Sequence, residues 1–213
     1  MQLDFRFVEI DYEIWALGQY LDIIERNIPH LSKTERDRLL ASISSHHGSD
    51  EDYLLVSQEA DRIEEDVIPR HLRGSFIVAL WAVFEGAVIS ITKHIQQVER
   101  LKLSLNDVRG DFLDRAMKYF DYIVEFALIV DPSDWEKLRN IEMIRHIIAH
   151  SNSRLNDLDP NKRKQITAIL NSGIGLREDE EFLLVEELFC RSAYETISKI
   201  LNDLLARTRS TFE

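Results

Sequence analysis

Apolar residues recur at intervals of three and four positions along almost the whole chain, which is the period of an amphipathic α-helix. The pattern predicts a first helix at about 8–27, ended by Pro29. A second helix is expected to begin with a capping box of Ser32 and Glu35 and to fade at a turn at 46–48.

The most apolar helix is expected at about 70–102, where apolar side chains nearly surround the helix axis. Such a helix belongs at the centre of a bundle. Glu85 is the lone acid of its apolar run, and we expect it to lie at an interface edge, to pair with a basic neighbour, or to support the Arg–His cluster described below. The other elements are expected at about 50–69, 106–129, 134–150, 160–170 and 186–209, with two short β-capable runs around 177–180.

Together these elements predict an all-α fold: an antiparallel helical bundle with short connections and a small β-hairpin near the C-terminus. The chain holds only 7 glycines and 4 prolines, which offers few tight turns and disfavours an all-β fold. We expect residues 1–66 to form N-terminal helices that pack on a helical domain of residues 67–213, the whole making one compact unit.

The formal net charge is −12, which argues against broad non-specific binding of nucleic acid and against docking on anionic lipid. One segment departs from this balance. Residues 134–164 contain seven Lys and Arg against five Asp and Glu, a local charge of +2. The cationic part of this anionic chain is therefore a place to look for an anionic ligand.

The chain carries features of a cytoplasmic protein. Its single cysteine, Cys190, cannot form an intrachain disulfide. The N-terminal residues are acidic where a signal peptide needs basic ones. The apolar stretch that includes 76–83 and ends before Glu85 is far shorter than the about 20 residues that cross a bilayer. We expect a cytoplasmic location and no membrane partner.

Candidate chemistry is concentrated in the stretch MIRHIIAHSN at 143–152. On a helical projection, His146 and His150 fall together, beside Arg139 and away from the apolar stripe of their own helix. Arg145 flanks that stripe, and Arg139 is a candidate to bind substrate or to support the cluster. The two histidines are therefore expected to point away from the core contact of this helix.

Four interpretations of this cluster remain open on the residues alone. A zinc protease helix needs a glutamate directly after its first histidine, and Ile147 stands there instead. A structural metal site needs further His or Cys ligands, for which the chain offers no convincing spacing. The cationic side chains can simply stabilise the helix by interacting with the negative end of its dipole. Finally, arginine can bind phosphate while histidine transfers protons near neutral pH. We expect neither a metal nor another cofactor.

The pattern Arg145-x4-His150, with the polar His146 directly after the arginine, resembles the signature of the HEPN superfamily, an all-α group common in prokaryotic toxin–antitoxin and defence systems. The preceding apolar segment 68–95, with its lone Glu85, is similar to the helix that precedes this signature in HEPN proteins. The resemblance covers about 68–152 and the remainder only as extra helices.

This resemblance implies a metal-independent endoribonuclease that works as a homodimer and leaves a 2′,3′-cyclic phosphate. It implies that His150 acts as general base or acid, that Arg145 stabilises the charge on phosphorus, and that His146 orients the substrate or supplies a second proton-transfer group. Asn152 is expected to contact phosphate or base. The partners implied are RNA, a second copy of the chain, and an antitoxin or regulatory protein.

Asn152 also marks a departure from one HEPN subgroup, whose members are paired with nucleotidyltransferase antitoxins. Those proteins have a tyrosine at this position, so this chain offers no tyrosine there for nucleotide modification. Two other functions compete with the nuclease. One is a non-catalytic, HEPN-like dimeric module that binds a nucleotide, an RNA or a protein. The other is a purely structural helical scaffold, in which the motif is a coincidence.

Overall fold

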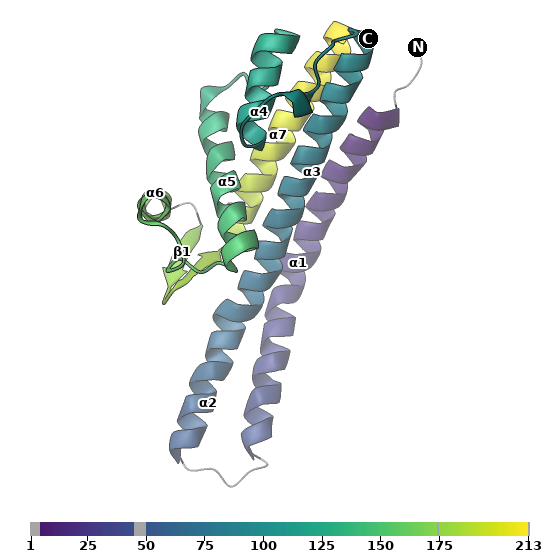
Figure 1. Cartoon of the computed structure of the whole chain (residues 1–213). Coiled ribbons are helices and arrows are strands. Elements are labelled where there is room, and N and C mark those ends of the chain that lie inside the picture. Colours follow the sequence, from purple (N-terminus) through teal and green to yellow (C-terminus); the bar gives the residue numbers. More distant parts are fainter. Residues whose placement is uncertain (1–4, 45–49, 174, 213) are drawn as a thin grey trace. The chain divides into compact units, whose positions relative to one another are not determined.

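The computed structural model describes residues 5–44, 50–173 and 175–212, and helices dominate it (Figure 1). The predicted all-α bundle with a small hairpin near the C-terminus is confirmed, whereas the predicted turn at 46–48 lies outside the described residues. In chain order the helices and strands are α1 (Phe5–Ser44), α2 (Asp50–Arg62), α3 (Ile68–Val98), α4 (Phe112–Tyr119), α5 (Pro132–Ser151), α6 (Pro160–Leu170), β1 (Leu176–Asp179), β2 (Phe182–Val185) and α7 (Glu187–Phe212).

The predicted break at Pro29 is wrong, because α1 runs through this proline without ending. A proline inside a helix removes one backbone hydrogen bond. The buried positions keep the helical period across the proline, from Ile24 and Ile28 before it to Ser32 after it. Ser32 is therefore buried inside α1 instead of capping a new helix. Packing of this face on both sides of Pro29 offsets the lost hydrogen bond.

Helix α2 continues into α3 through one π-helical turn, Ile63–Val67, so the predicted boundary near Pro69 is wrong as well. Pro69 follows this π-helical turn as the second residue of α3. The run Asp50–Val98 is the one described helix that is long and apolar enough, by length and composition alone, to cross a membrane. The apolar part of this helix is therefore longer than the stretch 76–83, because apolar residues continue beyond the lone Glu85. Half of this apolar window is buried in the structure.

The region predicted as one helix at 106–129 contains only a short one. Helix α4 begins after Asp111, whose carboxylate accepts a hydrogen bond from the N–H of Asp114 at 2.9 Å. It passes into a π-helical turn, Phe120–Val124, that ends at Glu125, a residue with a left-handed backbone (φ 56°). Helices α5, α6 and α7 and the hairpin lie close to their predicted ranges.

The chain divides into two compact units, and α1, α3, α5 and α7 each contribute residues to both. Unit 1 comprises Met1–Gly18, Ala79–Glu142 and Ser192–Glu213. Within it, the Tyr194 hydroxyl donates to the carbonyl of Ile14 at 3.1 Å and joins α7 to α1. The rings of Phe7 and His94 meet at 4.8 Å and join α1 to α3. Its buried core includes Trp81, Phe84, Ile91, Leu113, Leu138 and Leu201.

Unit 2 comprises Gln19–Val78 and Met143–Arg191. Its hairpin pairs Leu176 with Val185 and Asp179 with Phe182 in antiparallel register. The segment after α5 joins the edge of this hairpin, because the N–H of Leu183 donates to the carbonyl of Ser153 at 2.8 Å. The predicted division at 66/67 falls inside unit 2 and stays a prediction.

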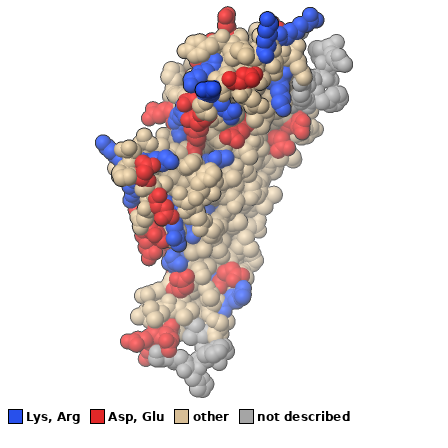
Figure 2. Space-filling model, viewed as in Figure 1, with Lys and Arg blue, Asp and Glu red and all other residues tan. Residues whose placement is uncertain are grey.

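Charged side chains of both signs are interspersed on the face shown in Figure 2, which displays no broad area of a single sign. Twenty-six basic residues stand against 38 acidic ones in the chain. Most described arginines therefore form an ion pair with a carboxylate. An arginine that forms none keeps a positive charge that could bind an anionic ligand.

Candidate functional site

The C-terminal part of α5 carries the motif, and packing on α3 fixes its orientation in unit 2. Ile144 and Ile147 are buried. Ile148 lies against Gly74 of α3 so closely that a Cβ added at Gly74 would be 3.1 Å from Ile148 Cγ2. Helix α5 is thus held by its apolar side, which leaves the side with the histidines free of this contact.

His146 and His150 lie side by side on the exposed face of α5. Their ring centroids are 4.6 Å apart and the rings are inclined at 46°. Both residues are exposed, as the helical period predicts. Two neighbouring imidazoles give one surface both a proton acceptor and a proton donor near neutral pH.

Arg145 is half-buried beside this pair. Its Nε is buried and has no hydrogen-bond partner among the described residues, and no described carboxylate forms an ion pair with its guanidinium. A buried donor without a partner costs stability, so it calls for an explanation. The uncompensated charge makes Arg145 available to an anion.

The pKa of His146 is lowered below its ordinary value. Partial burial is the largest cause, followed by the positive charges of His150, Lys162 and Arg145. Lys162 belongs to the first turn of α6, so a second element adds positive charge to this surface. His146 is therefore biased toward its neutral, proton-accepting form.

Asn152 has a role in ending α5. It and Ser153 adopt left-handed backbone angles (φ 48° and 66°), and the N–H of Ser153 donates to the carbonyl of Ile147 at 3.2 Å. Asparagine tolerates this conformation better than most residues, and such a reversal is a common helix end. The side chain of Asn152 is exposed. Its contact with a substrate stays a prediction.

Arg139 and Glu85 belong to unit 1, and both form hydrogen bonds with other residues of that unit. The Arg139 guanidinium bonds Asp114, Glu142 (3.0 Å) and Asp111 (3.5 Å). Glu85 accepts a hydrogen bond from the Trp81 indole at 2.7 Å, one turn away on its own helix. The partner of Glu85 is thus an indole N–H, where the sequence had suggested a basic residue. Their predicted supporting roles toward the Arg–His cluster remain predictions.

Three further residues of unit 2 were not singled out by the sequence: Arg70, Arg154 and Phe182. The guanidinium carbons of Arg70 and Arg154 lie 3.9 and 5.7 Å from the ring centroid of Phe182. These residues come from the start of α3, the loop after α5 and strand β2. No local signal in the sequence indicates that such distant segments meet.

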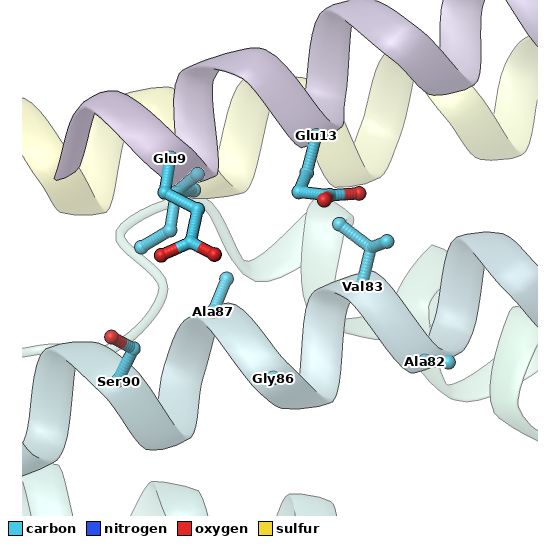
Figure 3. Close-up of a pocket in the computed structure, with 8 residues that line it drawn as sticks. Glu9, Glu13, Ala82, Val83, Gly86, Ala87 and Ser90 are labelled. Atoms are coloured by element: carbon cyan, nitrogen blue, oxygen red, sulfur yellow. The ribbon is translucent and has the colours of Figure 1, made fainter. Parts of the chain in front are cut away.

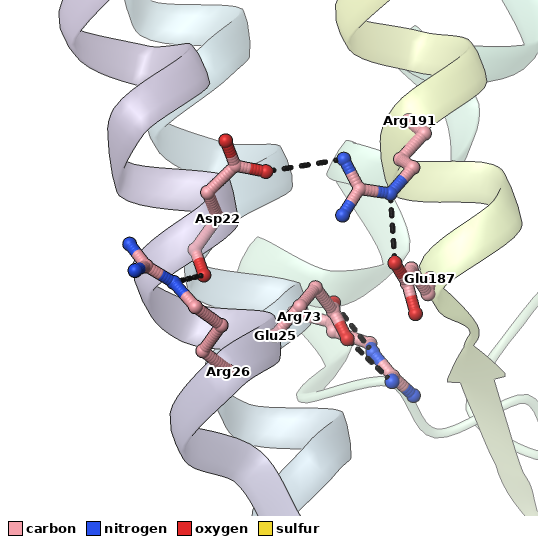
Figure 4. Close-up of polar contacts among 6 residues, drawn as sticks. All are labelled: Asp22, Glu25, Arg26, Arg73, Glu187 and Arg191. Carbon is pink, nitrogen blue, oxygen red and sulfur yellow. Dashed lines mark hydrogen bonds and ion pairs between the residues drawn. The ribbon is translucent and has the colours of Figure 1, made fainter.

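A hollow of about 580 Å³ in unit 2 is lined by Arg73, Arg177, Arg191 and neighbouring residues at the start of α7. Its arginines are paired, as Figure 4 shows for two of them. Arg73 forms two hydrogen bonds with Glu25, at 2.8 and 2.9 Å, and Arg191 bridges Asp22 and Glu187. This hollow is a network of internal ion pairs and presents little uncompensated charge.

A second hollow, of about 440 Å³, lies between α1 and α3 in unit 1 (Figure 3). Glu9 and Glu13 line it from α1, and small residues of α3, including Ala82 and Gly86, line it from the other side. It contains two carboxylates, the Ser90 hydroxyl and apolar groups, but no Lys, Arg or His side chain that could bind a phosphate. It belongs to unit 1, whereas the histidine pair belongs to unit 2.

Metal-ligating residues do not gather in the described parts of the chain. Among residues 5–44, 50–173 and 175–212, no three His, Cys, Asp or Glu side chains are grouped so that they could hold a metal ion. The histidines at 46 and 47 lie outside this range.

No protein-family model matches the chain, and neither does any curated protein sequence or solved structure. A functional proposal must therefore come from the chemistry of the described side chains and from the resemblance of residues 68–152.

Proposed function

We propose that the chain is a HEPN-like, metal-independent endoribonuclease of a cytoplasmic toxin or defence system, with Arg145, His146 and His150 as its working groups. One observation carries the proposal: two exposed imidazoles, 4.6 Å apart, share a helix with an arginine that no described carboxylate neutralises. In a chain of net charge −12, an arginine left unpaired in this way is suited to an anionic substrate.

The reaction needs two proton transfers and one stabilised anion. His146, whose pKa is lowered, accepts the proton of a ribose 2′-hydroxyl. The 2′-oxygen attacks the adjacent phosphorus, and the bond from phosphorus to the 5′-oxygen breaks. His150 donates a proton to that leaving oxygen, while Arg145 stabilises the added negative charge on the phosphoryl oxygens. The products are a 2′,3′-cyclic phosphate and a free 5′-hydroxyl.

A second copy of the chain fits this chemistry. In an in-line displacement, the attacking and leaving oxygens lie on opposite sides of phosphorus. Two rings 4.6 Å apart on one helix approach a phosphate from a single side. A two-fold symmetric dimer would place a second histidine pair opposite the first, so that one copy accepts the proton and the other donates it.

The test is cleavage of single-stranded RNA by the purified chain in EDTA. We expect His150→Ala to lower the rate by about 10²- to 10⁴-fold, as for loss of a proton-transfer group, and Arg145→Ala to lower it by about 10²-fold or more. His30→Ala, which changes another exposed histidine, is the matched control and should cleave as the wild type does. Equal rates in all four proteins would indicate a contaminating nuclease and defeat the proposal.

The non-catalytic alternative makes a different prediction. A binding module would leave every RNA intact, while Arg145→Ala would still weaken its capture of RNA. Intact RNA together with Arg145-dependent binding would therefore replace the nuclease by this second function.

A further inference from the structure

Arg70, Arg154 and Phe182 of unit 2, the stacked-arginine cluster, combine two cations with one aromatic ring. Arg70 lies in the first turn of α3, with its guanidinium carbon 3.9 Å from the centroid of Phe182 on β2. Arg154 lies in the loop after α5 at 5.7 Å from the same centroid, and its backbone forms an isolated β-bridge with Phe182. The cluster is therefore held by backbone pairing as well as by cation–aromatic contact.

Arg70 and Arg145 differ from the other described arginines of unit 2 in their bonding partners. Arg26 donates to the carbonyl of Asp22. Among the described residues of unit 2, only Arg70 and Arg145 have neither a carboxylate nor a backbone oxygen as partner, and the Nε of each is buried without one. Eight other arginines each bond at least one carboxylate: Arg36, Arg38, Arg62, Arg73, Arg154, Arg163, Arg177 and Arg191.

The surroundings of Arg70 add positive charge. The pKa of Arg70 is lowered, chiefly by burial and then by the charges of Arg62 and Arg154. Asp66 acts in the opposite direction, but its carboxylate already bonds Arg177. Arg62 and Arg154 are themselves paired, with Glu59 and Glu181, so the guanidinium of Arg70 is the charge in this cluster that the negative charge of a ligand would newly compensate.

Stacking determines which part of a ligand this cluster can hold. A guanidinium that lies over a ring covers the face of that ring, so Phe182 does not offer this face to a nucleobase. The ring does not cover the edge of the guanidinium, where the N–H groups form the fork that suits phosphate oxygens. The Nε of Arg70 is buried, which leaves its terminal N–H groups for a ligand. The cluster is therefore suited to phosphates rather than to bases.

The cluster is close to the histidine pair along two elements. Arg70 precedes Gly74 by one helical turn, about 6 Å along α3, and Gly74 meets Ile148 of α5. Arg154 follows His150 by four residues, a span of at most about 14 Å even if extended. A strand of a few nucleotides can reach from the histidines to both arginines.

We infer that the stacked-arginine cluster binds phosphates of single-stranded RNA beside the histidine pair, an inference that rests on the proposed function for its substrate. In-line attack by a 2′-hydroxyl requires a nucleotide released from the A-form helix, which favours a single strand over a duplex. Binding through phosphates makes the site tolerant of base sequence. The histidine pair then cleaves the linkage next to the phosphates that the cluster holds.

The experiment measures binding of a ten-nucleotide 2′-O-methyl RNA, which lacks the attacking hydroxyl and cannot be cleaved. We expect Arg70→Ala to weaken binding about tenfold, as for one charge-assisted contact. The slope of log affinity against log salt concentration should become shallower by about 0.7, the value for one phosphate of a single strand. Arg38→Ala, which removes the same charge from a side chain that is 78% exposed in unit 2, is the matched control and should bind within about twofold of the wild type.

Arg154→Ala is the second variant, because its half-exposed side chain can be removed with little risk to folding. Phe182→Leu keeps an apolar side chain but removes the stacking, and it should weaken binding to a similar extent as Arg70→Ala. Thermal melting checks that each variant is folded. Binding by folded Arg70→Ala and Arg154→Ala that equals binding by Arg38→Ala would overturn the inference, as would selective capture of a phosphorylated peptide.

Failure of this inference can be distinguished from failure of the proposed function. A protein that binds the 2′-O-methyl RNA through Arg70 but leaves ordinary RNA intact supports the cluster and defeats the nuclease. If the protein cleaves RNA but Arg70→Ala binds the 2′-O-methyl RNA as tightly as the wild type does, the nuclease proposal is supported and phosphate binding by the cluster is contradicted.

Discussion

At the scale of single residues, the partners of each charged group distinguish structural from candidate functional side chains. Arg139 and Arg73 look equally basic in the sequence, yet both are neutralised by carboxylates in the fold. Arg145 and Arg70 have buried donors without partners. Local rules of this kind are most often broken at functional sites, where a ligand restores the balance.

The lowered pKa of His146 gives a pH-dependent prediction for stability. The unfolded chain takes up the proton near the usual pKa of about 6.5, while the folded chain resists it, so the unfolded state binds more protons in this range. The stabilisation is therefore present above about pH 6.5 and is lost as the pH falls through the folded-state pKa. We expect the urea midpoint of the wild type to fall more between pH 7.5 and 5.5 than that of His146→Gln. His30→Gln should keep the wild-type dependence, and parallel curves for wild type and His146→Gln would contradict this account.

At the scale of elements, close packing of α3 on α5 positions the site. Gly74 permits this approach because it has no Cβ to meet Ile148. Gly86 lies on the same helix, but a Cβ added there would meet nothing within 4 Å. The two glycines thus differ in their surroundings while sharing the same helical conformation.

This difference predicts opposite effects of substitution. Gly86→Ala should raise the free energy of unfolding by about 0.5–1 kcal/mol, since alanine restricts the unfolded chain and favours the helix. Gly74→Val should lower it by about 1–3 kcal/mol, because the added carbon atoms push α5 away from α3. Urea denaturation of both variants measures these changes. Equal stabilisation by the two substitutions would show that α3 and α5 do not approach as described.

At the scale of the whole molecule, four helices run through both compact units. A helix is cooperative along its length, so loss of one unit leaves half-helices exposed in the other. The chain carries natural reporters for each unit. All three tryptophans, Trp15, Trp81 and Trp135, belong to unit 1, and the single cysteine, Cys190, belongs to unit 2.

We therefore expect the two units to unfold together. Cys190 is buried, and burial, with a smaller contribution from the charge of Glu25, raises the pKa of its thiol to about 12. The thiol should resist a thiol reagent at neutral pH until unit 2 opens. Labelling of Cys190 and tryptophan fluorescence, followed through the same urea titration, should have coincident midpoints. Two separate midpoints would show that the units unfold independently.

The sequence by itself determined the all-α class, the hairpin, and the exposure of His146 and His150, because these depend on a helical or strand period that neighbouring residues set. It predicted wrong ends for the helices at Pro29 and Pro69, since a proline is a local signal and packing on other elements can carry a helix past it.

Only the tertiary structure decided which charges are neutralised and which distant residues meet. Phe182 reaches Arg70 and Arg154 through the packing of β2, α3 and the loop after α5. Arg139 of α5 bonds Asp111 and Asp114, which lie at the start of α4, although the sequence had allowed it to support the histidines. Such partners are selected by the positions of whole elements in space, and the local period of a sequence carries no information about those positions.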